Sequence, residues 1–259
     1  MTDERVEPTK ESLDARGSRG QQRKISGVPF GGSRMKPRLL DLFCGAGGAA
    51  MGYSRAGVEV VGVDINPQPN YPFEFIQGDA LDPAWVSYSD RGEVFDAIHA
   101  SPPCQRYSSM SNCRPGLSET YPDLVGPVRG LLEATGLPYV IENVPRSPVR
   151  PDLILCGCMF GMRSRRPRWF ESNIGLGVAP LHSHGSPAFN PQNVKGRKRI
   201  REEFGAGDPD KMWRKDVGVE WMTRAEGRES IPPAYTEFIG TQLLTFLDSL
   251  SGAAEEGEA

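Results

Sequence analysis

Cys104 stands directly after two prolines that end a short apolar run, and a thiol presented in this way is a candidate nucleophile. The run over residues 94–99 is typical of a buried strand. Pro102 and Pro103 end that strand, stiffen the backbone and remove two N–H donors. Because ligands of open α/β sheets bind at the carboxyl ends of strands, we expect Cys104 at an active edge. The alternative is a loop cysteine without a chemical role.

Glu142 and two arginines are the next candidate catalytic residues. Glu142 lies in an apolar strand expected over residues 139–144, where partial desolvation raises the pKa of a carboxyl group and suits it to proton donation. Arg166 and Arg168 precede a further short strand at alternate positions. Side chains two residues apart on an extended chain share a face, so we expect the two guanidinium groups to lie together.

A glycine-rich turn and two aspartates indicate a ligand at neighbouring strand ends. Residues 45–48 read Gly-Ala-Gly-Gly, and such a turn lets the backbone approach a ligand closely, although its spacing matches neither the dinucleotide nor the phosphate-loop pattern. Asp64 ends the second expected strand, where it can accept from ribose hydroxyls, and Asp79 ends the third, where it can accept from an adenine amino group. Each aspartate alone is equally well explained as a turn residue, but the set indicates an adenosine-containing cofactor.

These positions require a framework of alternating strands and helices. Strands are expected over residues 37–43, 58–64, 73–76, 94–99, 139–144, 153–155 and 169–170. Helices are expected over residues 51–55, 81–90 and 124–134, and from Pro232 onward. Such alternation predicts an α/β fold with a doubly wound, mostly parallel sheet.

Composition divides the chain into five segments. Residues 1–36 are charged and poor in large apolar side chains, so a disordered tail is expected there. The segments that follow are a catalytic domain over 37–172, a small, irregular basic recognition segment over 173–220, a C-terminal helix over 221–250 that returns to the catalytic domain, and a loose acidic tail over 251–259.

Charge and cysteine content indicate the kind of partner and the cellular compartment. The net charge is only −3, but residues 163–201 hold nine Lys or Arg and one acid, which suits phosphate contacts; a solvated basic loop is the alternative.

Five cysteines, an odd number, form no disulfide framework and indicate a reducing compartment. Cys156 and Cys158 lack a second cysteine pair, so no metal site is expected. No apolar run reaches membrane-spanning length, and we expect a cytoplasmic protein.

Four segments resemble successive motifs of the DNA (cytosine-5) methyltransferases. They are Asp41–Gly48, Pro102–Gln105, Glu142–Val144 and Arg166–Arg168, in the order that this family has them. The resemblance implies the Rossmann-like fold of S-adenosylmethionine-dependent methyltransferases and DNA as the partner. It also implies a monomer in a bacterial or phage-infected cell, acting as an orphan enzyme or beside a restriction enzyme.

The resemblance further implies a role for each site residue. Cys104 would add to carbon 6 of a flipped cytosine, Glu142 would protonate ring nitrogen 3, and Arg168, with Arg166, would bind the carbonyl oxygen at carbon 2. S-adenosylmethionine would donate the methyl group and leave as S-adenosylhomocysteine. Its pocket would be lined by Phe43, Gly45, Ala46, Gly47, Gly48, Asp64, Ile65, Asp79 and Pro102. Nucleic acid would be contacted by Ser108, Lys195, Arg197 and Lys198.

The chain also departs from the family pattern. Asp64 is followed by Ile65 where the family more often has Glu and an aromatic residue, and Thr241 stands where Asn is expected. Only about 50 residues separate Phe170 from Trp221, which is short for a target-recognition domain, so a short or loosely specified target is expected. The alternatives are methylation of cytosine in RNA or in a nucleotide, and a non-catalytic protein that binds S-adenosylmethionine or DNA.

Overall fold

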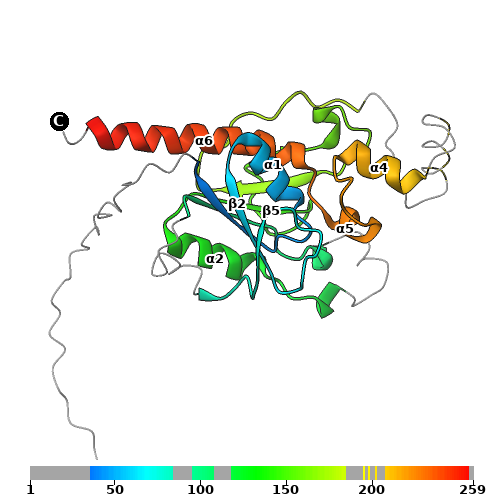
Figure 1. Cartoon of the computed structure of the whole chain (residues 1–259), viewed down its shortest axis with the longest axis horizontal. Helices are drawn as coiled ribbons and strands as arrows, with labels where there is room; N and C mark the ends of the chain where they lie inside the picture. The colour runs from blue at the N-terminus through cyan, green and yellow to red at the C-terminus, as the bar shows by residue number, and fades with distance from the viewer. Residues whose placement is uncertain are drawn as a thin grey trace, which may run out of the picture. The chain divides into compact units, whose positions relative to one another are not determined.

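Seven strands form one mixed sheet in the order β3-β2-β1-β4-β5-β7-β6 (Figure 1). The computed structural model describes residues 36–83, 95–107, 118–184 and 208–256, together with Lys195, Lys198 and Glu202. Its strands are β1 (Arg38–Leu42), β2 (Glu59–Asp64), β3 (Glu74–Gln77), β4 (Ala97–Ala100), β5 (Tyr139–Asn143), β6 (Leu153–Leu155) and β7 (Arg168–Ser172). Its helices are α1 (Gly48–Ala56), α2 (Val125–Thr135), α4 (Pro209–Val217), α5 (Arg224–Glu229) and α6 (Pro233–Glu256), with 3-10 turns η3 (Gln105–Tyr107), η5 (Ser118–Thr120) and η6 (Gly157–Phe160).

The sheet is parallel from β3 to β5 and antiparallel at β7 and β6. The leucines of the central strand β1, at positions 39, 40 and 42, have no exposed surface. A continuous apolar strand of this kind is typical of a parallel sheet that is covered on both faces. The predicted α/β fold with a doubly wound, mostly parallel sheet is confirmed.

Helices cover both faces of the sheet: α1 and α6 pack together on one face, and α2 lies on the other (Figure 1). Tyr235, Ile239 and Leu243 of α6 recur every four residues and are buried, as the apolar pattern of this helix predicts. Gly52 of α1 permits the close approach of the two helices. A Cβ atom at Gly52 would lie 2.1 Å from the carbonyl oxygen of Pro233.

α4 lies in the segment expected to be irregular, and α5 lies in the C-terminal segment but before Pro232, where the expected helix begins. Asp208 caps α4 and is followed by a proline at the first helical position, and Thr223 forms a capping box with Glu226 at the start of α5. Behind α4, a small apolar cluster packs against Ala46 in the glycine turn; its members are Trp213, Val217, Val219 and Met222. The end of the expected irregular segment therefore has a core, and that core supports the turn.

The two expected tails compare differently with the structure. A loose acidic tail is expected over 251–259, but α6 continues to Glu256. Residues 251–256 are therefore helical. The expected tail over 1–36, apart from Lys36, and most of the helix expected over 81–90 lie outside the described residues. Among the helices that the structure describes, none is long and apolar enough to cross a membrane.

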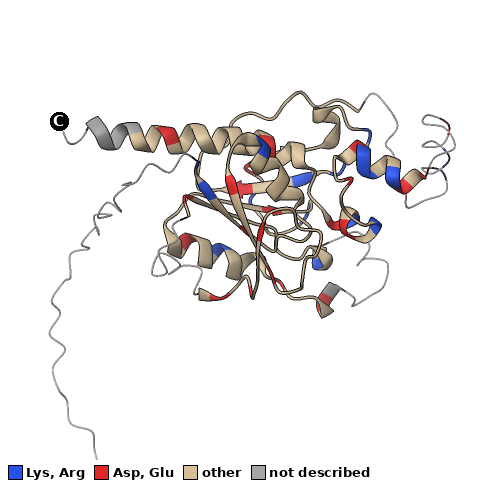
Figure 2. Ribbon diagram, in the orientation of Figure 1, with Lys and Arg blue, Asp and Glu red and all other residues tan. Residues whose placement is uncertain are grey.

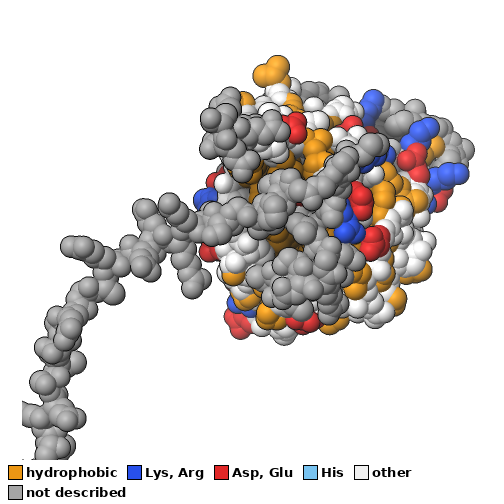
Figure 3. Space-filling view, turned by 60° about the vertical axis from the view of Figure 1, so that its left-hand side comes forward, with side chains coloured by type: hydrophobic (Ala, Val, Ile, Leu, Met, Phe, Trp, Pro, Cys, Tyr) orange, Lys and Arg blue, Asp and Glu red, His pale blue; other side chains and the backbone are white. Residues whose placement is uncertain are grey.

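Charge on the described surface is mixed. Lys211, Arg214 and Lys215 make α4 the most visibly basic helix in Figure 2, although acidic residues flank them. On the face turned forward in Figure 3, acidic and basic side chains lie among hydrophobic ones. α4 thus offers three cations among acidic neighbours.

Candidate active site

Cys104 lies on a turn that is tied to two neighbouring strands. The Ser101 N–H donates to the carbonyl oxygen of Leu42 in β1 at 3.1 Å. The buried Asn143, at the end of β5, donates from Nδ2 to the carbonyl oxygen of Pro102 at 2.9 Å. These contacts fix the proline turn, and Cys104 is presented, partly buried, beyond the carboxyl end of β4.

Glu142 is buried in β5 and forms an ion pair with Arg168, the first residue of β7. Glu142 Oε1 and Arg168 Nε are 2.8 Å apart, and the two side chains are 7% and 13% exposed. Burial raises the pKa of Glu142 above its ordinary value, while Arg168 and a hydrogen bond from Ser101 act in the opposite direction. A carboxyl group in this state suits the proton donation that the sequence predicts.

The surroundings of Cys104 in the free protein disfavour its thiolate form. Burial raises the pKa of Cys104 above its ordinary value, the negative charge of Glu142 raises it further, and Arg168 lowers it. Arg168 therefore favours the thiolate of Cys104, as expected, but burial and the charge of Glu142 together have the larger, opposite effect on the pKa. Attack by Cys104 requires loss of the thiol proton when a substrate enters.

Arg166 lies before β7 and differs from Arg168 in its backbone conformation and in its hydrogen-bond partners. Its backbone is left-handed, with φ of 40°, and it precedes β7, so the alternation of a strand does not apply to it. Its NH2 group donates to the carbonyl oxygens of Arg228 at 3.0 Å and Ser230 at 2.5 Å, and its guanidinium carbon lies 5.2 Å from the centre of the Trp213 ring. Arg166 interacts electrostatically with Arg168, Glu142 and Cys104, and it also fastens the start of β7 to the connection between α5 and α6.

A buried hydrogen-bonded chain, which the sequence analysis did not identify, runs from Tyr53 to Glu142. His99 in β4 is fully buried, with Nδ1 3.0 Å from Tyr53 Oη and Nε2 2.8 Å from Ser101 Oγ. Ser101 in turn bonds to Glu142. Burial lowers the pKa of His99 to about 3, so the imidazole is neutral and orients Ser101 rather than supplying a charge. The only signal in the sequence is a histidine inside an apolar strand.

Asp64 and the glycine turn meet at the carboxyl end of β2. The Gly45 N–H donates to Asp64 Oδ2 at 3.1 Å, and the Asn66 N–H donates to Oδ1 at 2.9 Å. Gly45 has φ of 49°, and a Cβ atom there would meet no atom within 4 Å, so space is open beside the turn. Ile65 is 65% exposed. Open space next to a carboxylate, a backbone turn and an exposed apolar side chain fits the adenosine-containing cofactor that the sequence predicts.

The second half of the glycine turn is used for packing. The Ala46 carbonyl oxygen accepts from Trp221 Nε1 at 3.0 Å. A Cβ atom at Gly48 would lie 2.4 Å from the carbonyl oxygen of Ile231, and one at Gly47 would also meet close neighbours. Ala46 and Gly48, both expected to line the cofactor pocket, therefore contact the C-terminal segment, whereas Gly47 packs against Tyr71 and Pro72.

The other residues expected at the cofactor lie along the same edge. Phe43 is partly buried with φ of 59°, Pro102 is buried, and Asp79 Oδ1 accepts from the Leu81 N–H at 2.9 Å after β3. Cys44 follows Phe43 and is buried, and burial raises its pKa far above the ordinary value. Cys44 is therefore an inert thiol, unlike a nucleophile.

The expected nucleic-acid contacts are only partly described. Lys195 and Lys198 are exposed, and Lys198 Nζ lies 3.6 Å from Glu202 Oε1. Ser108 and Arg197 lie outside the described residues.

Residues 37–146 match the family model described as C-5 cytosine-specific DNA methylase. The resemblance drawn from the sequence is confirmed over this stretch, which includes Cys104 and Glu142, whereas Arg168 lies beyond it. No curated protein matches the chain.

Several solved structures are similar to this chain. The S. pombe Dnmt2 methyltransferase has a TM-score of 0.50 and 11% identity, over 82% of this chain and 99% of that chain. A Spodoptera frugiperda DNMT2 mutant has a TM-score of 0.41 and 18% identity, over 61% of this chain and 59% of that one. A protein described as a DNA modification methyltransferase encoded within an E. coli prophage has a TM-score of 0.38 and 20% identity, over 52% and 45%. The chain spans about half the length of the last two, and the likeness to the first concerns the fold.

Proposed function

We propose that this chain, whose residues 37–146 form a C-5 cytosine-specific DNA methylase domain, transfers a methyl group from S-adenosylmethionine to carbon 5 of cytosine in DNA. The observation that carries the proposal is the meeting of Cys104, Glu142 and Arg168. β4 and β5 run parallel, and β7 is antiparallel to β5, so the ends of β4 and β5 and the start of β7 share one edge of the sheet.

Each of the three side chains answers a difficulty of the reaction. Carbon 5 of cytosine is a poor nucleophile until a nucleophile adds to carbon 6. The Cys104 sulfur gives up its proton to solvent and forms that bond. Glu142 takes up a proton from solvent and donates it to ring nitrogen 3, so that no negative charge stays on the ring. Arg168 donates hydrogen bonds to the carbonyl oxygen at carbon 2 and keeps Glu142 oriented through their ion pair.

The end of the reaction restores the free thiol. S-adenosylmethionine, when bound, supplies the electrophilic methyl group that carbon 5 takes up. Carbon 5 then loses its proton to a water molecule, and the bond from carbon 6 to the Cys104 sulfur breaks. The sulfur leaves as a thiolate that takes a proton from solvent, and Glu142 recovers its proton from nitrogen 3. Proton donation by a positioned acid of this kind contributes about 100- to 10,000-fold to the rate.

The cofactor is held, on this proposal, at the open space beside Gly45. Asp64 accepts from the ribose hydroxyls with the lone pairs that its two backbone donors leave free, and Asp79 accepts from the adenine amino group. Ile65 packs against the adenine ring, which accounts for an exposed isoleucine at this edge.

DNA is the proposed substrate because the matching family model describes DNA methylases. A cytosine inside a duplex cannot be reached by Cys104, so it must leave the stack, at a cost of a few kcal/mol. Lys195 and Lys198 are exposed and α4 is basic, which suits contacts with phosphates. Because these contacts are with the backbone, binding should weaken steeply as salt concentration rises.

The test is methylation of a defined duplex, followed by digestion to nucleosides and mass spectrometry for 5-methylcytosine. Cys104→Ser should abolish the product, while Cys44→Ser, in which a hydroxyl replaces an inert thiol, should retain it. RNA of the same sequence and free cytidine nucleotides form parallel arms. Product from RNA or nucleotide but not from DNA would reassign the substrate, and no product in any arm would contradict the proposal.

A further inference from the structure

Two cysteines and two histidines from separate segments gather away from the Cys104 site. Cys156 and Cys158 lie at the start of η6, after β6, and His182 and His184 follow β7. One ligand atom of each residue lies within 4.8 Å of the others. Two of the three histidines in the whole chain are used here. Among the residues that the structure describes, this is the group of potential ligands with the composition of a metal site.

The spacing of the four atoms is close to that of a tetrahedral zinc site. Zinc binds sulfur at about 2.3 Å and imidazole nitrogen at about 2.0 Å, which places the ligand atoms about 3.3–3.8 Å from one another. Cys156 Sγ and His184 Nε2 are 3.5 Å apart, and His182 Nε2 and His184 Nε2 are 2.8 Å apart. Binding of an ion requires the two imidazoles to separate by about half an ångström, which exposed side chains permit.

The local backbone explains why the two sulfur atoms lie together. Gly157 stands between them, its N–H donates to the carbonyl oxygen of Arg165, and a Cβ atom on it would lie 1.8 Å from the Ser164 carbonyl oxygen. Only glycine allows the chain to fold back so closely. The loop from Cys156 to Arg165 is therefore closed on itself, with Cys156 and Cys158 beside the residues that follow β7.

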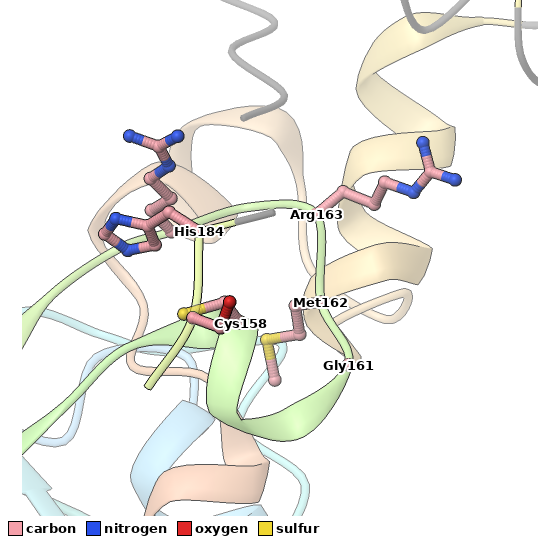
Figure 4. A pocket seen from close by; sticks show the side chains of 7 residues that line it. Cys158, Gly161, Met162, Arg163 and His184 are labelled. Atoms are coloured by element: carbon pink, nitrogen blue, oxygen red, sulfur yellow. The ribbon is translucent and has the colours of Figure 1, made fainter. Parts of the chain in front are cut away.

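Cysteine binds a metal as the thiolate, so an ion displaces the thiol protons when it binds. The backbone N–H of Met159 donates to the Cys156 sulfur. Arg163 and Arg165 line the same cavity, of about 230 Å³, together with Cys158 and His184. Figure 4 shows Cys158 on the ribbon after β6 and His184 on the neighbouring segment, both at this cavity. Two thiolates balance the charge of a divalent ion, so the bound site would be neutral.

We propose that Cys156, Cys158, His182 and His184 bind one zinc ion. Four protein ligands leave no open position, so the site is structural rather than catalytic. It joins the loop that leads to Arg166 and Arg168 with the chain that enters the basic recognition segment. The spacing of one residue within each pair is shorter than in common zinc fingers, so the ion clamps two segments of an existing fold rather than organising a finger.

The first test is the metal content of the full-length protein, expressed with added zinc and dialysed against a weak chelator. We expect one zinc ion per chain in the wild type. His182→Gln and His184→Gln each remove a ligand from an exposed position, so they leave the fold intact and should lose most of the zinc. Ser183→Ala, which changes the residue between them, is the matched control and should retain it.

The second test identifies the ligands by spectroscopy. Cobalt(II) in place of zinc should give the visible bands of a tetrahedral ion and a near-ultraviolet thiolate band, and Cys158→Ser should weaken the thiolate band. Wild type without zinc, with iron instead of zinc, or with a disulfide between Cys156 and Cys158 would contradict the proposal. So would equal zinc in the histidine variants and in Ser183→Ala. Neither test needs DNA or S-adenosylmethionine, so the result does not depend on the proposed methyl transfer.

Discussion

Replacing Glu142 by Gln should make the Cys104 thiol more acidic while it slows methyl transfer. The Glu142 charge raises the pKa of Cys104, so a neutral amide of the same shape should lower that pKa. The amide cannot donate a proton to nitrogen 3, and the loss of a positioned acid costs about 100- to 10,000-fold in rate, equivalent to about 3–5 kcal/mol of transition-state stabilisation. One variant thus moves thiol reactivity and catalysis in opposite directions.

Arg168→Gln is the matched counterpart. The Arg168 charge lowers the pKa of Cys104, so its removal should raise that pKa, while methyl transfer again falls. Both side chains of the ion pair are almost fully buried, 2.8 Å apart. Removing one partner leaves the other charge buried without compensation, so each single variant should also lose about 3–5 kcal/mol of stability, and the double variant less than the sum.

The assay is the rate of alkylation of Cys104 by iodoacetamide across a pH series, read by peptide mass spectrometry. Below its pKa, a thiol reacts in proportion to its thiolate fraction. Cys44, buried and inert, serves as the internal reference in the same protein. If both variants shift the Cys104 profile in the same direction, or leave it in place, the electrostatic coupling of the three residues is refuted.

Three further predictions concern the framework. Gly52→Ala should destabilise the protein by about 1–3 kcal/mol in urea unfolding, because its Cβ would lie 2.1 Å from a backbone oxygen. Gly130 is an exposed position of α2 where a Cβ meets nothing within 4 Å, so Gly130→Ala should stabilise the protein by about 0.5–1 kcal/mol. Equal effects of the two substitutions would contradict the packing argument. Burial, followed by the charge of a neighbouring aspartate, raises the pKa of Asp41 well above 3.8, so the folded state holds this proton more tightly than the unfolded state. Stability should therefore fall as pH rises above 3.8, and Asp41→Asn should flatten this decline in a series of thermal unfolding curves; an unchanged slope would refute it. Asn143→Ala removes the hydrogen bond to the Pro102 carbonyl oxygen that holds the turn of Cys104. It should lower kcat, while calorimetry should show unchanged binding of S-adenosylmethionine. A loss of cofactor binding with kcat unchanged would show that the turn serves the cofactor instead.

The sequence predicts the strands, and the positions of Cys104 and Glu142 relative to them, because these signals are local. An apolar run followed by two prolines marks both the end of β4 and the place of Cys104. Glu142 is recognisable as a carboxylate inside an apolar strand for the same reason. In these cases a few neighbouring residues determine both the backbone and the exposure of the side chain.

Features that depend on distant partners are not predictable in this way. Arg166 lies two residues before Arg168, but its left-handed backbone and its contacts with the connection between α5 and α6 depend on tertiary packing. The four ligands of the proposed zinc site come from two segments that only the fold brings together. The position of β7 between β5 and β6 is likewise a matter of pairing, which an apolar pattern of a few residues does not encode.

The most direct test of the account is covalent capture of Cys104 on a duplex that carries 5-fluorocytosine at the target. Fluorine cannot leave carbon 5 as a proton does, so the bond from sulfur to carbon 6 persists after methyl transfer. With S-adenosylmethionine present, we expect a complex that survives denaturing electrophoresis and a DNA-modified peptide that maps to Cys104. Cys104→Ser should give no complex. A complex that forms through another residue, or methylation that continues in Cys104→Ser, would contradict the central claim.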